Sequence, residues 1–145
     1  MSAIRLSEDF TPEIGTRTNN QLTGNVGLYY VCYRLSRLGW NVLPTSRNAR
    51  GVDIVVYDQK GKRRHTIQVK TLSTENNIPL GSDSSPLLAD YLVICRNVSI
   101  EPELFVAEMA EARHAAINHK GGLWIPTPRY EKFDTRLEAV VGRGN

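Results

Sequence analysis

Residues 51–71 read GVDIVVYDQKGKRRHTIQVKT, and this stretch decides the fold. Two runs of alternating apolar residues flank a basic segment, which is the pattern of a β-hairpin. Gly61 supplies the positive φ that a tight turn requires, so we expect Lys60 and Gly61 to form a two-residue turn. That turn sets a register in which Asp53 lies opposite Gln68.

This register sorts the side chains of the hairpin into two faces, because successive side chains along a strand alternate. Asp53, Gln68 and Lys70 share one face at the strand ends remote from the turn. A three-residue loop with a bulge would shift the register and move Gln68 out of line, but it would also oppose apolar with polar residues. In the favoured register the other face is wholly apolar and is made of Val52, Ile54, Val56, Ile67 and Val69.

A carboxylate, an amide oxygen and an ammonium group on one face suit the hydrolysis of a phosphodiester. Asp53 can bind Mg²⁺ or Mn²⁺, and Gln68 can offer a neutral oxygen. Lys70 can orient or help deprotonate the attacking water and offset the charge that builds on the phosphate. The structural alternative is a salt bridge between Asp53 and Lys70, and the hairpin by itself does not choose between the two.

The remaining chain predicts an α/β fold with a mixed sheet. Residues 1–19 form a polar arm, and residues 20–145 form one domain. We expect a helix over residues 20–38, because apolar residues recur there at helical spacing: Leu22, Val26, Tyr29 and Tyr33. Val31, Leu35 and Leu38 widen the expected buried face. The tyrosines of this helix are expected in the core or at a dimer surface. Strands are expected over residues 40–44, 89–97, 103–109 and 122–126. Residues 72–88 form a long polar connection, which we expect to border the site that Lys70 serves. Helices are expected over residues 110–118 and 130–141.

The order of helix, strand and hairpin around Asp53, Gln68 and Lys70 resembles the PD-(D/E)xK nuclease superfamily, over about residues 20 to 97. The resemblance implies a restriction-endonuclease-like αβββαβ core, with a mixed central sheet flanked by helices. It implies catalytic roles for Asp53, Gln68 and Lys70, and a metal site at Asp53, Gln68 and Val69. The cofactor it implies is Mg²⁺ or Mn²⁺.

Two departures from that superfamily concern the metal site. Gln68 stands where the family has an acid, which removes one negative charge. Many members also carry a glutamate on the first helix, whereas this chain has Asn25 and Leu28 at those positions. Gln21 and Asn25, one turn apart, can present amides toward the site instead. We therefore expect weak metal binding, around one ion.

Charge is concentrated around the hairpin. Residues 47–70 carry seven Lys or Arg against two Asp, whereas the rest of the chain carries 11 Lys or Arg against 13 acids. A basic patch on a slightly acidic body is typical of nucleic-acid binding. Trp124 and Tyr130 could stack on bases, but core or interface packing is the favoured interpretation. The candidate DNA-contacting residues are Ser46, Arg47, Asn48, Arg50, Lys60, Lys62, Arg63 and Arg64, of which we expect only part to touch DNA.

These features predict a metal-dependent DNA endonuclease. The alternative is a nuclease-fold module that binds nucleic acid or protein without catalysis, which Gln68 and the missing helix glutamate favour. DNA is the expected partner, and a homodimer or higher assembly is expected because a chain this small needs a second copy to cut both strands. The N-terminus lacks a basic start followed by an apolar run and no stretch would span a membrane, so a cytoplasmic location is expected.

Overall fold

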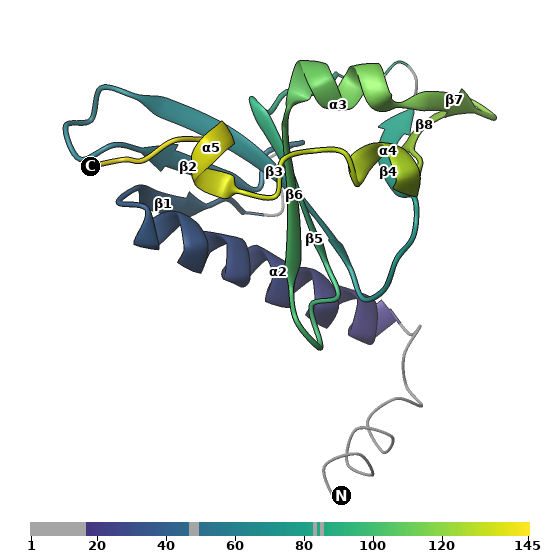
Figure 1. Cartoon of the computed structure of the whole chain (residues 1–145), viewed down its shortest axis with the longest axis horizontal. Helices are drawn as coiled ribbons and strands as arrows, with labels where there is room; N and C mark the ends of the chain where they lie inside the picture. Colours follow the sequence, from purple (N-terminus) through teal and green to yellow (C-terminus); the bar gives the residue numbers. More distant parts are fainter. Residues whose placement is uncertain (1–16, 47–49, 83, 85) are drawn as a thin grey trace, which may run out of the picture.

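The computed structural model describes residues 17–46, 50–82, 84 and 86–145, arranged as two sheets with helices around them (Figure 1). A long helix opens the described chain, and short helices follow late in it. The helices are α2 (Arg17–Arg37), α3 (Met109–Ala115), α4 (Thr127–Tyr130) and α5 (Leu137–Val140). The strands are β1 (Asn41–Pro44), β2 (Ile54–Tyr57), β3 (Arg64–Leu72), β4 (Ile78–Ser82), β5 (Tyr91–Arg96), β6 (Glu103–Glu108), β7 (Ile117–His119) and β8 (Gly122–Ile125).

The main sheet has five strands in the order β1-β2-β3-β5-β6. Only β3 and β5 pair in parallel, and their neighbours pair antiparallel, so the sheet is mixed as predicted. A smaller sheet has the order β4-β8-β7. Helix α2 runs along the main sheet in Figure 1, and the small sheet lies at the end of the molecule away from β1 and β2.

Strand β5 shows how the main sheet separates two apolar cores. Val93 and Cys95 belong to the core beneath α2, and Leu92 and Ile94 belong to the core beneath the small sheet and α3. All four are fully buried, which confirms the predicted central strand covered on both faces.

Helix α2 begins at Arg17, three residues before its predicted start, and buries a different face from the predicted one. Val31, Leu35 and Leu38 are buried as expected, but Leu22, Val26, Tyr29 and Tyr33 are between 50% and 61% exposed. The helix carries apolar stripes on two opposite sides, and Gly27 decides which one packs. A Cβ at Gly27 would lie 2.8 Å from Thr71 Cβ, so only glycine lets α2 approach β3 this closely.

The hairpin has the predicted register but a wider turn. Ile54 pairs with Ile67 and Tyr57 with Arg64, which is the predicted register, and the ladder ends at Ile54. Beyond it Asp53 contacts β3 through Ile67 O and Val69 N, and Val52 packs against the core on the other side of the sheet from Ile54, not beside it as predicted. The Asp58 N–H donates to Arg63 O over 3.0 Å, which leaves 59–62 as a four-residue loop rather than the expected two. Gly61 has the expected positive φ of 70°. The buried Asp58 carboxylate explains the wider turn, because it accepts hydrogen bonds from Lys62 N and Arg63 Nε over 2.8 and 3.0 Å.

Three other predictions need correction. The connection 72–88 contains β4, whose buried Ile78 and Leu80 pack under the small sheet. The helix expected over 110–118 ends at Ala115 and gives way to β7, and the helix expected over 130–141 is reduced to α5 after α4. The backbone partner of β4 is β8, far away in sequence, whereas β7 forms a local hairpin with β8 through Lys120 and Gly121.

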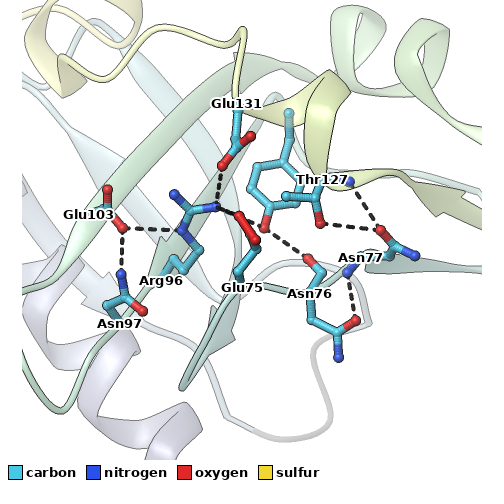
Figure 2. A network of polar contacts seen from close by, with 9 residues as sticks. Glu75, Asn76, Asn77, Arg96, Asn97, Glu103, Thr127 and Glu131 are labelled. Carbon is cyan, nitrogen blue, oxygen red and sulfur yellow. Dashed lines mark hydrogen bonds and ion pairs between the residues drawn. The ribbon is translucent and has the colours of Figure 1, made fainter.

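A network around Arg96 fastens the small sheet to the main one (Figure 2). Arg96 is 8% exposed, its guanidinium donates to Glu103 and Glu131 over 3.1 and 2.7 Å, and it lies 4.8 Å from the Phe105 ring centroid. The Tyr130 hydroxyl donates to the carbonyl of Asn76 just before β4. Burial by itself would lower the pKa of Arg96, but the hydrogen bonds to Glu131, Glu103 and Tyr130 raise it above the ordinary arginine value.

None of the helices in the described ranges has the length and apolar character needed to cross a membrane.

Candidate active site

Asp53 is held at the end of β2 by three hydrogen bonds. Its N–H donates to Ile67 O over 2.9 Å, and its carbonyl accepts from Thr45 N over 2.9 Å. Its side-chain Oδ2 accepts from Val69 N over 2.8 Å. Where the pairing of β2 with β3 ends, the Asp53 carboxylate accepts the hydrogen bond from Val69 N that a main-chain carbonyl would accept within the ladder. This hydrogen bond holds the carboxylate in position without a ligand.

Gln68 and Lys70 line an open pocket of about 480 Å³. Both are half-buried on β3, and their side chains alternate with Ile67 and Val69, which face α2. Residues of β4 and of the segment after it also line the pocket, so the connection that follows Lys70 borders its pocket as expected. The remaining lining residues are Arg50, Gly51, Leu80, Gly81, Ser82, Ser84, Pro86 and Leu87.

The pKa of Lys70 is lowered by its surroundings. Burial lowers its pKa below the ordinary value of 10.5, and the charge of Asp53 opposes that shift in part. The ion pairs formed within the described residues do not include one between Asp53 and Lys70, whose charged atoms lie beyond the 4.0 Å limit of a salt bridge. A desolvated lysine near a carboxylate, without a salt bridge to it, is characteristic of sites that do chemistry.

Two solved structures to which this chain is similar are those of nucleases. Hjc, a Holliday junction resolvase from the archaeal hyperthermophile Archaeoglobus fulgidus, superposes with a TM-score of 0.61 and 16% identity, over 83% of this chain and 96% of its own. The chain has the restriction-endonuclease-like fold. A bacterial homing endonuclease matches with a TM-score of 0.49 and 19% identity, over 61% of this chain and 68% of its own. No protein-family model and no curated protein matches the sequence.

Within the restriction-endonuclease-like fold, the donors near Lys70 suit one hard cation. Asp53 keeps one carboxylate oxygen beyond the one that accepts from Val69 N, and Gln68 has a side-chain carbonyl at the pocket. Val69 has only its main-chain oxygen to offer. Oxygen donors of this kind fit Mg²⁺ or Mn²⁺. In the described ranges no three His, Cys, Asp or Glu side chains gather into a metal-holding group.

The two amides expected from the first helix lie on α2, across the sheet from the pocket. Gln21 and Asn25 are both exposed. Since α2 covers the face of Ile67 and Val69, these amides reach the site only around the end of the strands. Their part in metal binding stays a prediction.

The predicted DNA-contacting residues fall into three groups. Arg50 is exposed and lines the pocket, and Ser46 is exposed just before it. Arg47 and Asn48 lie outside the described residues. At the hairpin turn and the start of β3 the exposed cations are Lys60, Lys62, Arg63 and Arg64.

Arg63 differs from the other turn cations because it has intramolecular partners. Its Nε pairs with Asp58 at 3.0 Å, and its Nη2 donates to Arg143 O over 2.8 Å. Its guanidinium also lies 5.1 Å from the Trp40 ring centroid. These contacts fasten the turn to the C-terminal segment, so Arg63 is less available for DNA than its neighbours.

Sequence reasoning missed the contribution of β4 to the pocket. Leu80, Gly81 and Ser82 line it together with Gln68 and Lys70. The available signal was the alternation of Ile78 and Leu80, which indicates a short strand inside a segment that otherwise reads as polar.

Proposed function

We propose that this chain is a metal-dependent DNA endonuclease that hydrolyses phosphodiester bonds at Asp53, Gln68 and Lys70. The observation that carries the proposal is the lysine with lowered pKa at the pocket, beside an amide oxygen and a carboxylate already positioned by Val69 N. The nuclease neighbours of the fold support the same class of reaction.

In this proposal each side chain has a separate task. Asp53 and Gln68, with the Val69 carbonyl, would hold the cation, whose charge would stabilise the phosphate and lower the pKa of a water when bound. Lys70 in its neutral form accepts a proton from the attacking water, whose oxygen bonds to phosphorus as the bond to the leaving oxygen breaks. A proton from solvent completes the leaving group. The lowered pKa increases the neutral fraction of Lys70 that can accept this proton.

The test is a nicking and cleavage assay on supercoiled plasmid and on branched DNA with Mg²⁺ or Mn²⁺. We expect cutting by the wild type, and its loss by about 100-fold or more in Asp53→Ala and Lys70→Ala with DNA binding retained. Lys132→Ala removes an exposed cation that does not line the pocket and should cut normally. Cutting that survives in both site variants would refute the assignment of the site.

The second candidate is a module that keeps the fold and binds nucleic acid or protein without catalysis. Gln68, which stands in place of an acid at the proposed metal site, favours it. Intact DNA binding with no cutting of any substrate, and no Mn²⁺ uptake by calorimetry even with DNA present, would establish this module and exclude the enzyme.

We further propose that the chain associates with a second copy through the exposed stripe of α2. The stripe consists of Leu22, Val26, Tyr29 and Tyr33, spaced by four, three and four residues like one seam of a coiled coil. Paired antiparallel with itself, it sets Leu22 against Tyr33 of the second copy and Val26 against Tyr29, so each aromatic ring meets an aliphatic side chain.

Charge favours the antiparallel direction of this pairing. Arg34 and Arg37 lie in the last turn of α2, and the helix as described carries no acidic residue. An antiparallel pair keeps the two Arg34 and Arg37 sets at opposite ends, whereas a parallel pair would bring them together. Because α2 and Lys70 lie on opposite faces of the sheet, the contact leaves both pockets open to DNA.

A further inference from the structure

The outer face of the small sheet carries an exposed apolar row. Trp124 on β8 pairs with Pro79 on β4 and with Ile117 on β7, so the three side chains lie side by side across the sheet. Trp124 is 38% exposed and Ile117 40%, whereas Ile125, the residue after Trp124, points inward and is fully buried. Tyr130, the other aromatic residue of this region considered for base stacking, is fully buried in the core.

The next row of the same face leads from Trp124 to the pocket. Gly122 pairs with Ser82 on β4 and with His119 on β7. A Cβ at Gly122 would lie 3.1 Å from Trp124 Nε1, so the indole lies against the bare backbone of Gly122. Ser82 also lines the pocket with Gln68 and Lys70. The face and the pocket are therefore continuous through Ser82.

The sequence around β7 and β8 has a charge that suits a polyanion. From residue 112 to residue 130 the sequence has three cations and two histidines but no acid. Lys120 occupies the β7–β8 turn with a positive φ of 52°, and Arg113 and Arg129 are exposed. Aromatic side chains on a sheet surface flanked by cations form the usual platform for unpaired bases.

We infer that the outer face of the small sheet, centred on Trp124, binds an unpaired nucleobase of the strand that enters the pocket. This inference rests on the proposed nuclease function, and it specifies the substrate as DNA with unpaired bases close to the scissile phosphate. Phosphate bound beside Lys70 lies on one side of Ser82, and the base stacks on Trp124 on the other side. A fully paired duplex hides its base faces and gains nothing from this platform.

Trp124 itself provides the measurement, because the chain has two tryptophans and the other one, Trp40, is only 3% exposed. The emission of metal-free wild type is recorded while a single-stranded oligonucleotide, or a blunt duplex of the same sequence, is added. We expect the single strand to quench the emission and the duplex to quench it much less. Trp124→Phe, which keeps only the buried Trp40, should show little quenching by either DNA.

Affinity for the single strand is measured separately by fluorescence anisotropy of labelled DNA. Trp124→Ala should weaken it by about 5-fold to 100-fold, because stacking contributes about 1–3 kcal/mol per base. Trp124→Phe keeps an aromatic ring and should retain most of the affinity. Ile100→Ala is the matched control, since Ile100 is 87% exposed in the turn between β5 and β6.

Three results would overturn the platform: unchanged affinity in a folded Trp124→Ala, equal quenching by both DNAs, or a change of emission with protein concentration alone, which would make the face a protein contact. Its failure is distinguishable from failure of the proposed function. Quenching without any cleavage keeps the platform and removes the enzyme, whereas Lys70-dependent cleavage with unchanged binding by Trp124→Ala keeps the enzyme and removes the platform.

Discussion

At the scale of single residues, Lys70 is held in a state that costs stability. Its pKa is lowered by burial, so the folded protein binds the lysine proton less tightly than the unfolded chain does. Wild-type stability therefore rises with pH between the lowered pKa and 10.5, and below that window the full cost is present.

Lys70→Met keeps the length of the side chain and removes its charge. We expect the free energy of unfolding near neutral pH to rise by about 0.5–1 kcal/mol, a gain that shrinks as pH rises toward 10.5, while cleavage is lost. Urea denaturation of the wild type and Lys70→Met, from neutral pH toward 10.5, measures this difference in the free energy of unfolding. Lys60→Met at the exposed turn is the control and should show no such trend. If Lys70→Met instead lowers stability at every pH, the lysine is structural.

Gln68 sets the charge of the proposed metal site. Gln68→Glu places a second carboxylate next to Asp53, and carboxylate count tunes affinity for hard cations, so we expect Mn²⁺ to bind about tenfold more tightly. Calorimetry on the free protein measures this without reference to activity. Gln68→Met removes the oxygen and should bind Mn²⁺ more weakly than the wild type. Equal affinity in all three proteins would exclude residue 68 as a ligand.

At the scale of elements, the close contact of α2 with β3 depends on Gly27. Gly27→Ala gains helix propensity but forces its Cβ into Thr71, so we expect a net loss of about 1–3 kcal/mol in thermal or urea unfolding. Gly24→Ala, one turn earlier with no atom within 4 Å of its added Cβ, should gain about 0.5–1 kcal/mol. Thr71→Ala should restore part of the loss in the Gly27→Ala background, and equal effects of the two alanines would contradict the close contact.

The attachment of the small sheet depends on Arg96. Arg96→Met leaves Glu103 and Glu131 without their common cation and removes the charge over Phe105, so we expect a loss of about 2–4 kcal/mol. Arg136→Met removes an exposed ion pair with Asp134 and should leave the free energy of unfolding almost unchanged. Similar losses in the two variants would mean that the buried Arg96 network stabilises the fold no more than an exposed ion pair does.

At the scale of the whole molecule, we expect the exposed stripe of α2 to hold two copies of the chain together. Tyr29→Glu puts a charge against Val26 of the second copy and should give a monomer in light scattering at high protein concentration. Adding Val26→Lys supplies the opposite charge in antiparallel pairing and should restore the dimer. Ile100→Glu is the control for an exposed apolar residue elsewhere. A dimer that persists in Tyr29→Glu would exclude this surface.

The sequence by itself determined the hairpin and the cluster it carries. The register that pairs Ile54 with Ile67, and that puts Gln68 and Lys70 on the face opposite Ile67 and Val69, follows from the alternation of the apolar residues, because side-chain period is a local property. Strand β5 could also be predicted from the sequence, since an unbroken apolar run has to be covered on both faces of the sheet.

Tertiary structure alone decided which contacts complete the site. Periodicity shows that α2 has apolar stripes on two sides, but only the approach of Gly27 to Thr71 selects the one that is buried. Strand β4 and the wall it gives the pocket depend on pairing with β8, some forty residues later in the chain. Such pairings are fixed by partners distant in sequence, which no local pattern specifies.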